Sequence, residues 1–260
     1  MLSKRVATTA AICLLLAAGT AACGDNKGSD KSAAASVPKL DTDKLSAQEI
    51  EKQAKDALAG AASVKIAGNM VTEDGKTAIN LSLDTKGQCT GSMGVPGMGS
   101  FEIISDGKTS YIKPDKEFWK AFGGPKGEQA GELFKGRYLT GFDNDPQMKA
   151  LSSVCNLAEF SKKITEDDGS KSDVKKGAAA NVNGVKTFTL TTTDDKGEQS
   201  TIHVATEGKF YPVRIEKAAG TGKESGQIDF TDYDKPLTVQ APSADNVIDF
   251  AKFKQQLQGA

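Results

Sequence analysis

The sequence has only one histidine, and its charges almost cancel. Its 260 residues include 33 Lys and Arg against 34 Asp and Glu, which gives a formal net charge of −1. A balance this close to zero excludes a generally basic nucleic-acid-binding protein. The single histidine, His203, removes most histidine-based metal sites and acid–base catalysis. It alternates with Ile202 and Val204 in a predicted strand, so we expect it on the opposite face, as a surface residue.

Complete catalytic and metal-binding motifs are absent as well. Residues 172–175 (Ser-Asp-Val-Lys) match S-x-x-K but lack its S-D-N and K-T-G partners. Residues 220–223 (Gly-Thr-Gly-Lys) resemble the end of a phosphate-binding loop, but Glu224 stands where Ser or Thr is required. Residues 143–145 begin like a calcium loop that Pro146 then breaks. We therefore expect no enzyme, no cofactor and no metal ion.

The main apolar run is short and lies at the N-terminus. Residues 6–22 follow Lys4 and Arg5, carry no charge and end in small residues directly before Cys23. This is the layout of a secretory signal peptide, and its apolar centre is shorter than the roughly 20 residues that a bilayer span needs. Residues 20–23 (Thr-Ala-Ala-Cys) resemble the lipobox of bacterial lipoproteins, in which the cysteine is diacylated, although the family pattern prefers Leu where Thr20 stands. An ordinary signal peptide or an uncleaved anchor is the alternative.

Cleavage before Cys23 predicts a lipid-anchored protein. It removes residues 1–22 with Lys4 and Arg5 and no acidic residue, so the net charge changes from −1 to −3. Acyl chains on Cys23 would hold the protein on the plasma membrane, at the extracytoplasmic face of the bacterial cell, because two chains anchor stably where one does not. Residues 23–40 are then the acylated cysteine and a flexible tether, too polar and too small in its side chains to fold.

Two cysteines remain once Cys13 is removed with the signal peptide and Cys23 is acylated. Cys89 and Cys155 form an even pair in an exported protein, which predicts a disulfide. In the chain-entropy model, closing so long a loop stabilises the fold by about 4 kcal/mol. The alternative is a redox pair, which usually has two cysteines close in sequence, as in C-x-x-C.

The rest of the chain, residues 41–260, is predicted to form one domain. Residues 45–62 have helical spacing, with Ser46 as N-cap and Glu49 three residues later, which is the capping-box pattern. Apolar residues alternate between residues 64 and 112, and tight turns divide this stretch into five antiparallel strands.

Short helices and a second set of strands follow. Residues 114–165 are spaced like short helices broken by Gly and Pro, and strands return between residues 174 and 233. Residues 239–257 add an edge strand and a short helix. The predicted disulfide ties the first strands to the helical segment, so we expect an α+β fold. Its architecture is a single strongly curved antiparallel β-sheet, a half-open barrel, with helices on the concave face.

Several strand sequences resemble those of a known family. They are residues 63–68 (SVKIAG), 182–188 (VNGVKTF), 208–215 (GKFYPVRI) and 228–239 (IDFTDYDKPLTV). With the lipobox, the tether and the amphipathic helix, they are similar to the LppX/LprG-type actinobacterial lipoproteins and the LolA-like carriers, over residues 45–248. The resemblance implies a half-open β-barrel that holds a lipid or other hydrophobic molecule at the outer membrane face, without catalytic residues.

The alternating apolar residues of the strands, with two aromatic residues of the helical segment, are the candidates for lining a hydrophobic ligand cavity. They are Val64, Ile66, Met70, Ile79, Leu81, Leu83, Phe101, Ile103, Trp119, Phe122, Leu190, Ile202, Val204, Val213 and Ile215. The alternative is a tethered cell-envelope interaction or sensor module with a filled core and no ligand, because periodicity does not separate a filled core from a cavity. The predicted partners are a hydrophobic ligand and a membrane transporter or other envelope protein, and we expect a monomer.

The turn around Pro96 and Gly97 is also flanked by apolar residues. Met93, Val95 and Met98 could form a lip that faces lipid, or they could pack on the sheet. We favour packing on the sheet.

Overall fold

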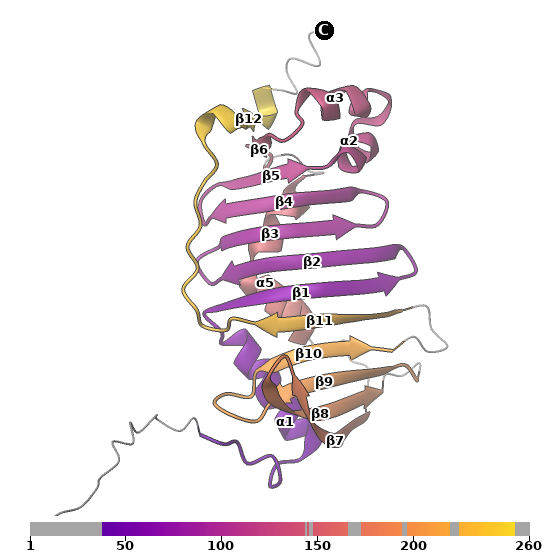
Figure 1. Cartoon of the computed structure of the whole chain (residues 1–260), viewed down its shortest axis with the longest axis vertical. Helices are drawn as coiled ribbons and strands as arrows, with labels where there is room; N and C mark the ends of the chain where they lie inside the picture. The colour runs from indigo at the N-terminus through magenta and orange to yellow at the C-terminus, as the bar shows by residue number, and fades with distance from the viewer. Residues whose placement is uncertain are drawn as a thin grey trace, which may run out of the picture. The chain divides into compact units, whose positions relative to one another are not determined.

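The strands before and after the helical segment join in one sheet (Figure 1). The computed structural model describes residues 38–252 except 144, 146–147, 166–172, 194–196 and 219–223. The order of the strands is β12-β6-β5-β4-β3-β2-β1-β11-β10-β9-β8-β7. The predicted α+β fold with one open sheet is confirmed. The signal peptide, Cys23 and nearly all of the tether lie outside the described residues.

The first strands form a meander joined by tight turns, as predicted. They are β1 Ser63–Thr72, β2 Gly75–Asp84, β3 Gln88–Val95, β4 Gly99–Asp106 and β5 Ser110–Pro114. The later strands are β6 Tyr138–Thr140, β7 Asp173–Val182, β8 Val185–Thr193, β9 Gln199–Ala205, β10 Pro212–Lys217, β11 Ser225–Thr231 and β12 Val247–Asp249. β1 pairs with β2 on one side and with β11 on the other, so the two halves of the chain meet there.

One strand pair departs from the predicted antiparallel sheet. β12 pairs with β6 in parallel, with Ile248 opposite Leu139. The cause is the connection after β11, which we call the C-terminal strap (residues 232–246). It runs along the ends of the central strands to the far edge of the sheet (Figure 1). A long connection of this kind lets a strand enter in either direction, whereas a tight hairpin allows only the antiparallel one.

The helices begin where the sequence supplies a capping residue. The first is α1, Ala47–Ala59, whose capping box is formed as predicted: Ser46 Oγ accepts from the Glu49 amide at 3.2 Å, and Glu49 Oε2 accepts from the Ser46 amide at 2.7 Å. The second is α2, Lys116–Gly123, capped by Asp115. The others are η1 Gly124–Lys126, α3 Gly127–Leu133, α4 Lys149–Ser152, η2 Ser153–Cys155, α5 Leu157–Thr165 and η3 Ala244–Asn246.

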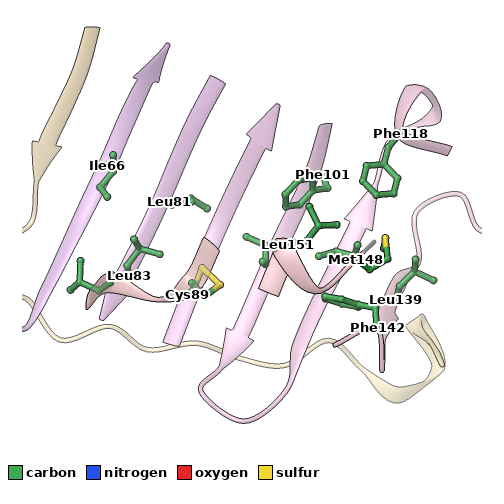
Figure 2. Packing of buried hydrophobic residues seen from close by; sticks show 14 of the residues in the cluster. Ile66, Leu81, Leu83, Cys89, Phe101, Phe118, Leu139, Phe142, Met148 and Leu151 are labelled. Atoms are coloured by element: carbon green, nitrogen blue, oxygen red, sulfur yellow. A yellow bond between two sulfur atoms is a disulfide. The ribbon is translucent and has the colours of Figure 1, made fainter. Parts of the chain in front are cut away.

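The core lies between the concave face of the sheet and the helices. Its largest cluster joins residues of β1–β6 and β11 to Leu58 of α1, Phe118 and Trp119 of α2, and Leu157 of α5. Figure 2 shows part of this cluster, with side chains of successive strands on one side of the sheet. A second cluster packs the N-terminal half of α1, through Ile50 and Ala54, against β7–β9 and the neighbouring loops. The helices therefore cover the concave face, as predicted.

Candidate functional site

The predicted disulfide joins the helical segment to the sheet. Cys89 of β3 and Cys155 of η2 are bonded, with their Cα atoms 5.3 Å apart and both side chains buried. Because η2 stands between α4 and α5, the bond holds this stretch of the helical cover against one half of the concave face.

The pairing register arranges the concave-face residues in rows across the strands. One row runs from β11 to β6 and is almost completely buried, with at most 2% of each side chain exposed. Its side chains are Phe230, Ile66, Leu81, Ile103, Ile112 and Leu139. The next row toward the disulfide contains Val64, Leu83 and Cys89, which are equally buried. This half of the concave face is a filled core.

Burial decreases in the rows that lie farther from the disulfide. From β10 to β3 the apolar side chains of these rows are only half-buried, although most of them pack against the filled core. In β4, Phe101 continues the row of Met93 and is buried, with 2% exposed. We call the half-buried side chains, with one aromatic residue of α2, the apolar strip: Met70, Ile79, Met93, Val95, Ile215, Ile228 and Phe122. The strip crosses β10, β11, β1, β2 and β3 and ends at α2.

Two glycines leave part of the strip without side chains. Gly68 lies between Ile228 and Ile79 in the register, and Gly226 lies opposite Met70. A Cβ atom on Gly226 would lie 3.0 Å from the Met70 sulfur and would also clash with the backbone of β1. The φ of Gly226 is +147°, which L residues rarely adopt. The Met70 thioether therefore lies beside a position of β11 that has no side chain.

The structure divides the predicted cavity residues into four groups. Seven lie in the filled core: Val64, Ile66, Leu81, Leu83, Phe101, Ile103 and Trp119. Leu190, Val204 and the half-buried Ile202 pack in the cluster beneath α1, and Val213 lies in a third cluster with Val182 and Ala205. The apolar strip contains Met70, Ile79, Phe122 and Ile215.

Three residues of the strip were outside the predicted lining. Met93 and Val95 pack against the core, as we favoured for this turn, whereas Met98 is 37% exposed. Ile228 alternates with Phe230 in β11, a strand that the sequence predicts. Its alternation was the signal that could have placed it on the concave face.

Among the surface grooves lined by described residues are four of about 340–860 Å³, and no residue of the strip lines these four. The largest lies on the opposite side of the sheet, between β3–β6 and α2–α3. There Lys113 binds Glu102 at 2.7 Å and lies 5.2 Å from the centre of the Tyr138 ring. The hydrogen bond to Glu102 raises the pKa of Lys113. The charges in this contact are paired with each other.

His203 is not the surface residue that the sequence predicts. Its side chain is only 11% exposed, and neither ring nitrogen has a hydrogen-bond partner among the described residues. Nε2 lies 3.7 Å from Glu216 Oε1. Arg214, opposite His203 in the register, binds both carboxylate oxygens of Asp229, at 2.5 and 3.0 Å. Its hydrogen bond lowers the pKa of Asp229. This network connects side chains of β9, β10 and β11, so we assign it a role in stabilising the sheet.

The described part of the chain has neither a metal-binding cluster nor a membrane-spanning helix. There, no three His, Cys, Asp or Glu side chains come together as a metal site would require. Within the same residues, no helix combines the length and the apolar character needed to cross a bilayer.

The comparisons with known proteins identify the fold. No family model matches the chain, and a search of curated proteins finds no match. The structure of LprF from Mycobacterium bovis superposes with a TM-score of 0.51 at 12% identity, covering 79% of this chain and 99% of LprF. Lipoprotein LppX from Mycobacterium tuberculosis gives 0.45 at 14% identity, covering 75% and 98%. The likeness to LprF shows that this chain has an LppX/LprG-type fold, which confirms the resemblance at the level of the fold.

Proposed function

We propose that this protein is a membrane-anchored extracytoplasmic lipoprotein that binds or carries a lipid or other hydrophobic molecule on the apolar strip. The observation that carries the proposal is the strip itself, a set of half-buried apolar side chains beside a filled core. The lipobox at Cys23, the sequence resemblance and the LprF-like fold support the same function. A ligand would cover apolar surface that the protein alone leaves partly in water.

The proposal places the ligand beside the filled core. Ile66, Leu81 and Ile103 have no measurable exposure, and the disulfide holds η2 over this half of the face. A ligand there would have to displace close-packed side chains, which costs several kcal/mol. On the strip, the ligand would add contacts to side chains that still have room for them.

We also propose binding without catalysis. The side chains of the strip are Ile, Val, Met and Phe, which supply neither a hydroxyl, thiol, amine or carboxylate for covalent catalysis nor a general base. The alternative function is a tethered interaction or sensor module without a ligand, and the close packing of the first row favours it. Native mass spectrometry of gently purified protein separates the two, because co-purifying lipid supports the carrier and a clean apo mass supports the module.

Binding of a dansyl-labelled fatty acid tests the site directly. Each methylene group moved from water to an apolar surface contributes about 0.8 kcal/mol, so affinity should increase with chain length. We expect Met70→Gln to weaken binding about fivefold to tenfold, because it places an amide on the strip. Val71→Gln is the matched control, since Val71 is the next residue, faces the other side of the sheet and is 36% exposed. Equal binding by both variants and the wild type would rule out the strip.

A further inference from the structure

The methionines of this chain gather at one place. The sequence has five, and Met1 lies outside the described residues. Met70 and Met93 belong to the apolar strip, and Met98 stands in the turn between β3 and β4, directly after Val95-Pro96-Gly97. Met148 is the exception, because it is buried in the filled core and only 1% exposed. Three of the four described methionines therefore lie on the strip or at its rim.

Their thioether groups differ in their access to solvent. Met98 is 37% exposed and is one of three large hydrophobic side chains classed as exposed among the described residues. Met70 and Met93 are half-buried. The cysteines Cys89 and Cys155 are already bonded to each other and buried. In the described part of the chain, the sulfur that an external oxidant can reach therefore belongs to Met70 and Met93 of the strip and to Met98 at its rim.

We propose that these methionines are an oxidation site that controls the affinity of the strip for its hydrophobic ligand. The oxidant is hydrogen peroxide. A sulfur lone pair of the thioether attacks one peroxide oxygen, an S–O bond forms and the O–O bond breaks. The second oxygen leaves as water with both protons. Sulfur loses two electrons and peroxide gains them, and the product is methionine sulfoxide.

The sulfoxide should weaken binding because it places a strong hydrogen-bond acceptor on an apolar surface. Met93 lies between Ile79 and Phe101 in the register, so its two cross-strand neighbours on the concave face offer carbon and no donor. A ligand covering a Met93 sulfoxide would remove its water without replacing the hydrogen bond. The bound molecule would therefore be released on oxidation, and enzymatic reduction of the sulfoxide would restore binding.

Peptide mapping by mass spectrometry after graded peroxide treatment tests the site. We expect Met98 to oxidise first, Met93 and Met70 next, and Met148 only when the protein unfolds. The affinity for a dansyl-labelled fatty acid should fall about tenfold after the strip methionines are oxidised, with the far-ultraviolet circular dichroism unchanged.

Two variants serve as controls. In the triple variant Met70→Leu, Met93→Leu and Met98→Leu, peroxide should change the affinity less than twofold relative to the untreated variant. Met148→Leu should respond to peroxide like the wild type. Oxidation of Met148 as fast as Met98, or oxidised protein that binds as tightly as untreated protein, would overturn the proposal.

Control of affinity rests on the proposed function, and the two can fail separately. If untreated protein does not bind the fatty acid, the proposed function fails and the control of affinity fails with it. The order in which the methionines oxidise is measured without any ligand, so it tests the modification site independently of the proposed function. If untreated protein binds and only the effect of oxidation is missing, the further inference alone is wrong.

Discussion

A single carboxylate fastens the C-terminal strap to the start of β1. Asp234 Oδ1 accepts from the Ala62 amide at 2.8 Å, and Oδ2 accepts from Tyr211 Oη at 2.6 Å and from Lys209 Nζ at 2.9 Å. The hydrogen bond from Tyr211, followed by that from Lys209, lowers the pKa of Asp234 from 3.8 to about 2. The Tyr211 ring stacks on Tyr233, with centroids 3.9 Å apart.

This carboxylate predicts a specific dependence of stability on pH. Because the folded pKa lies below the ordinary value, the contribution is present above about pH 4 and is lost as the pH falls toward 2. Asp234 is about one-third exposed, so we discount the shift for solvent screening and expect Asp234→Asn to lower the free energy of unfolding by about 1 kcal/mol at pH 7. Urea unfolding at pH 7 and pH 2 measures this. A difference between variant and wild type that is equal at both pH values would contradict the assignment.

Ser46 and His203 show what can be read from single residues. The capping box of Ser46 and Glu49 was predictable because both partners lie within one turn of the same helix. The burial of His203 was not, because the residues around it include Arg214 and Glu216 of the neighbouring strand. Strand alternation predicts on which face of the sheet a residue lies. It does not predict which long side chains the register places beside that residue and thereby bury it.

The N-cap of α1 supports a local prediction. Ser46→Ala removes the acceptor for the Glu49 amide and should lower the free energy of unfolding by about 1 kcal/mol. Ser46→Asp keeps an acceptor at the same place and should recover most of that loss. Thermal unfolding of the three proteins side by side measures the effect, and equal melting temperatures for Ser46→Ala and wild type would show that the cap is dispensable.

At the scale of elements, the disulfide determines how firmly the helical cover is held. The double variant Cys89→Ala and Cys155→Ala should lower the free energy of unfolding by about 2–4 kcal/mol. Amide hydrogen exchange should accelerate in η2 and the following turns of α5, because their covalent attachment to β3 is gone. It should stay slow in the N-terminal half of α1, whose Ile50 and Ala54 pack in a separate cluster.

A reducing agent provides the control for the disulfide prediction. It should accelerate exchange in the wild type only under conditions that expose the buried bond, and it should have no effect on the double variant. Uniform acceleration across α1 and α5 in the double variant would mean that the bond stabilises the whole fold without holding the helical cover in particular.

The candidate site was predictable only in part, for a reason that lies in how elements pack. Alternation placed Ile66, Ile79 and Ile215 on one face of the sheet, as the structure does. It could not tell which of them the helices cover. Whether the helices cover a residue depends on where η2 and α5 lie along the strands. The disulfide and long-range packing determine those positions. The division between filled core and strip therefore required the structure.

At the scale of the whole molecule, the pairing of β1 with β11 makes one unit of two distant segments. Lys65 lies opposite Thr231 and Val71 opposite Ser225 in an antiparallel ladder. The sequence predicted one sheet from the disulfide and from the lack of a linker. It could not predict that these two strands would be neighbours, because hairpin turns report only on strands adjacent in sequence. Val37–Ala260 forms one compact unit, in which the largest core cluster contains residues from both halves.

We therefore predict that a destabilising substitution where β1 pairs with β11 also destabilises the far end of the core, at α2. Phe230 of β11 is 1% exposed and lies opposite Ile66, so Phe230→Ala should lower the free energy of unfolding by about 3–5 kcal/mol. Trp119, the only tryptophan, lies in α2 beyond β5. If the sheet unfolds cooperatively, its fluorescence and the far-ultraviolet circular dichroism should shift to the same lower midpoint. Val185→Ala, at a 41% exposed site, should move neither. A fluorescence midpoint that stays in place while the circular dichroism shifts would show that the two halves unfold separately, despite their shared ladder.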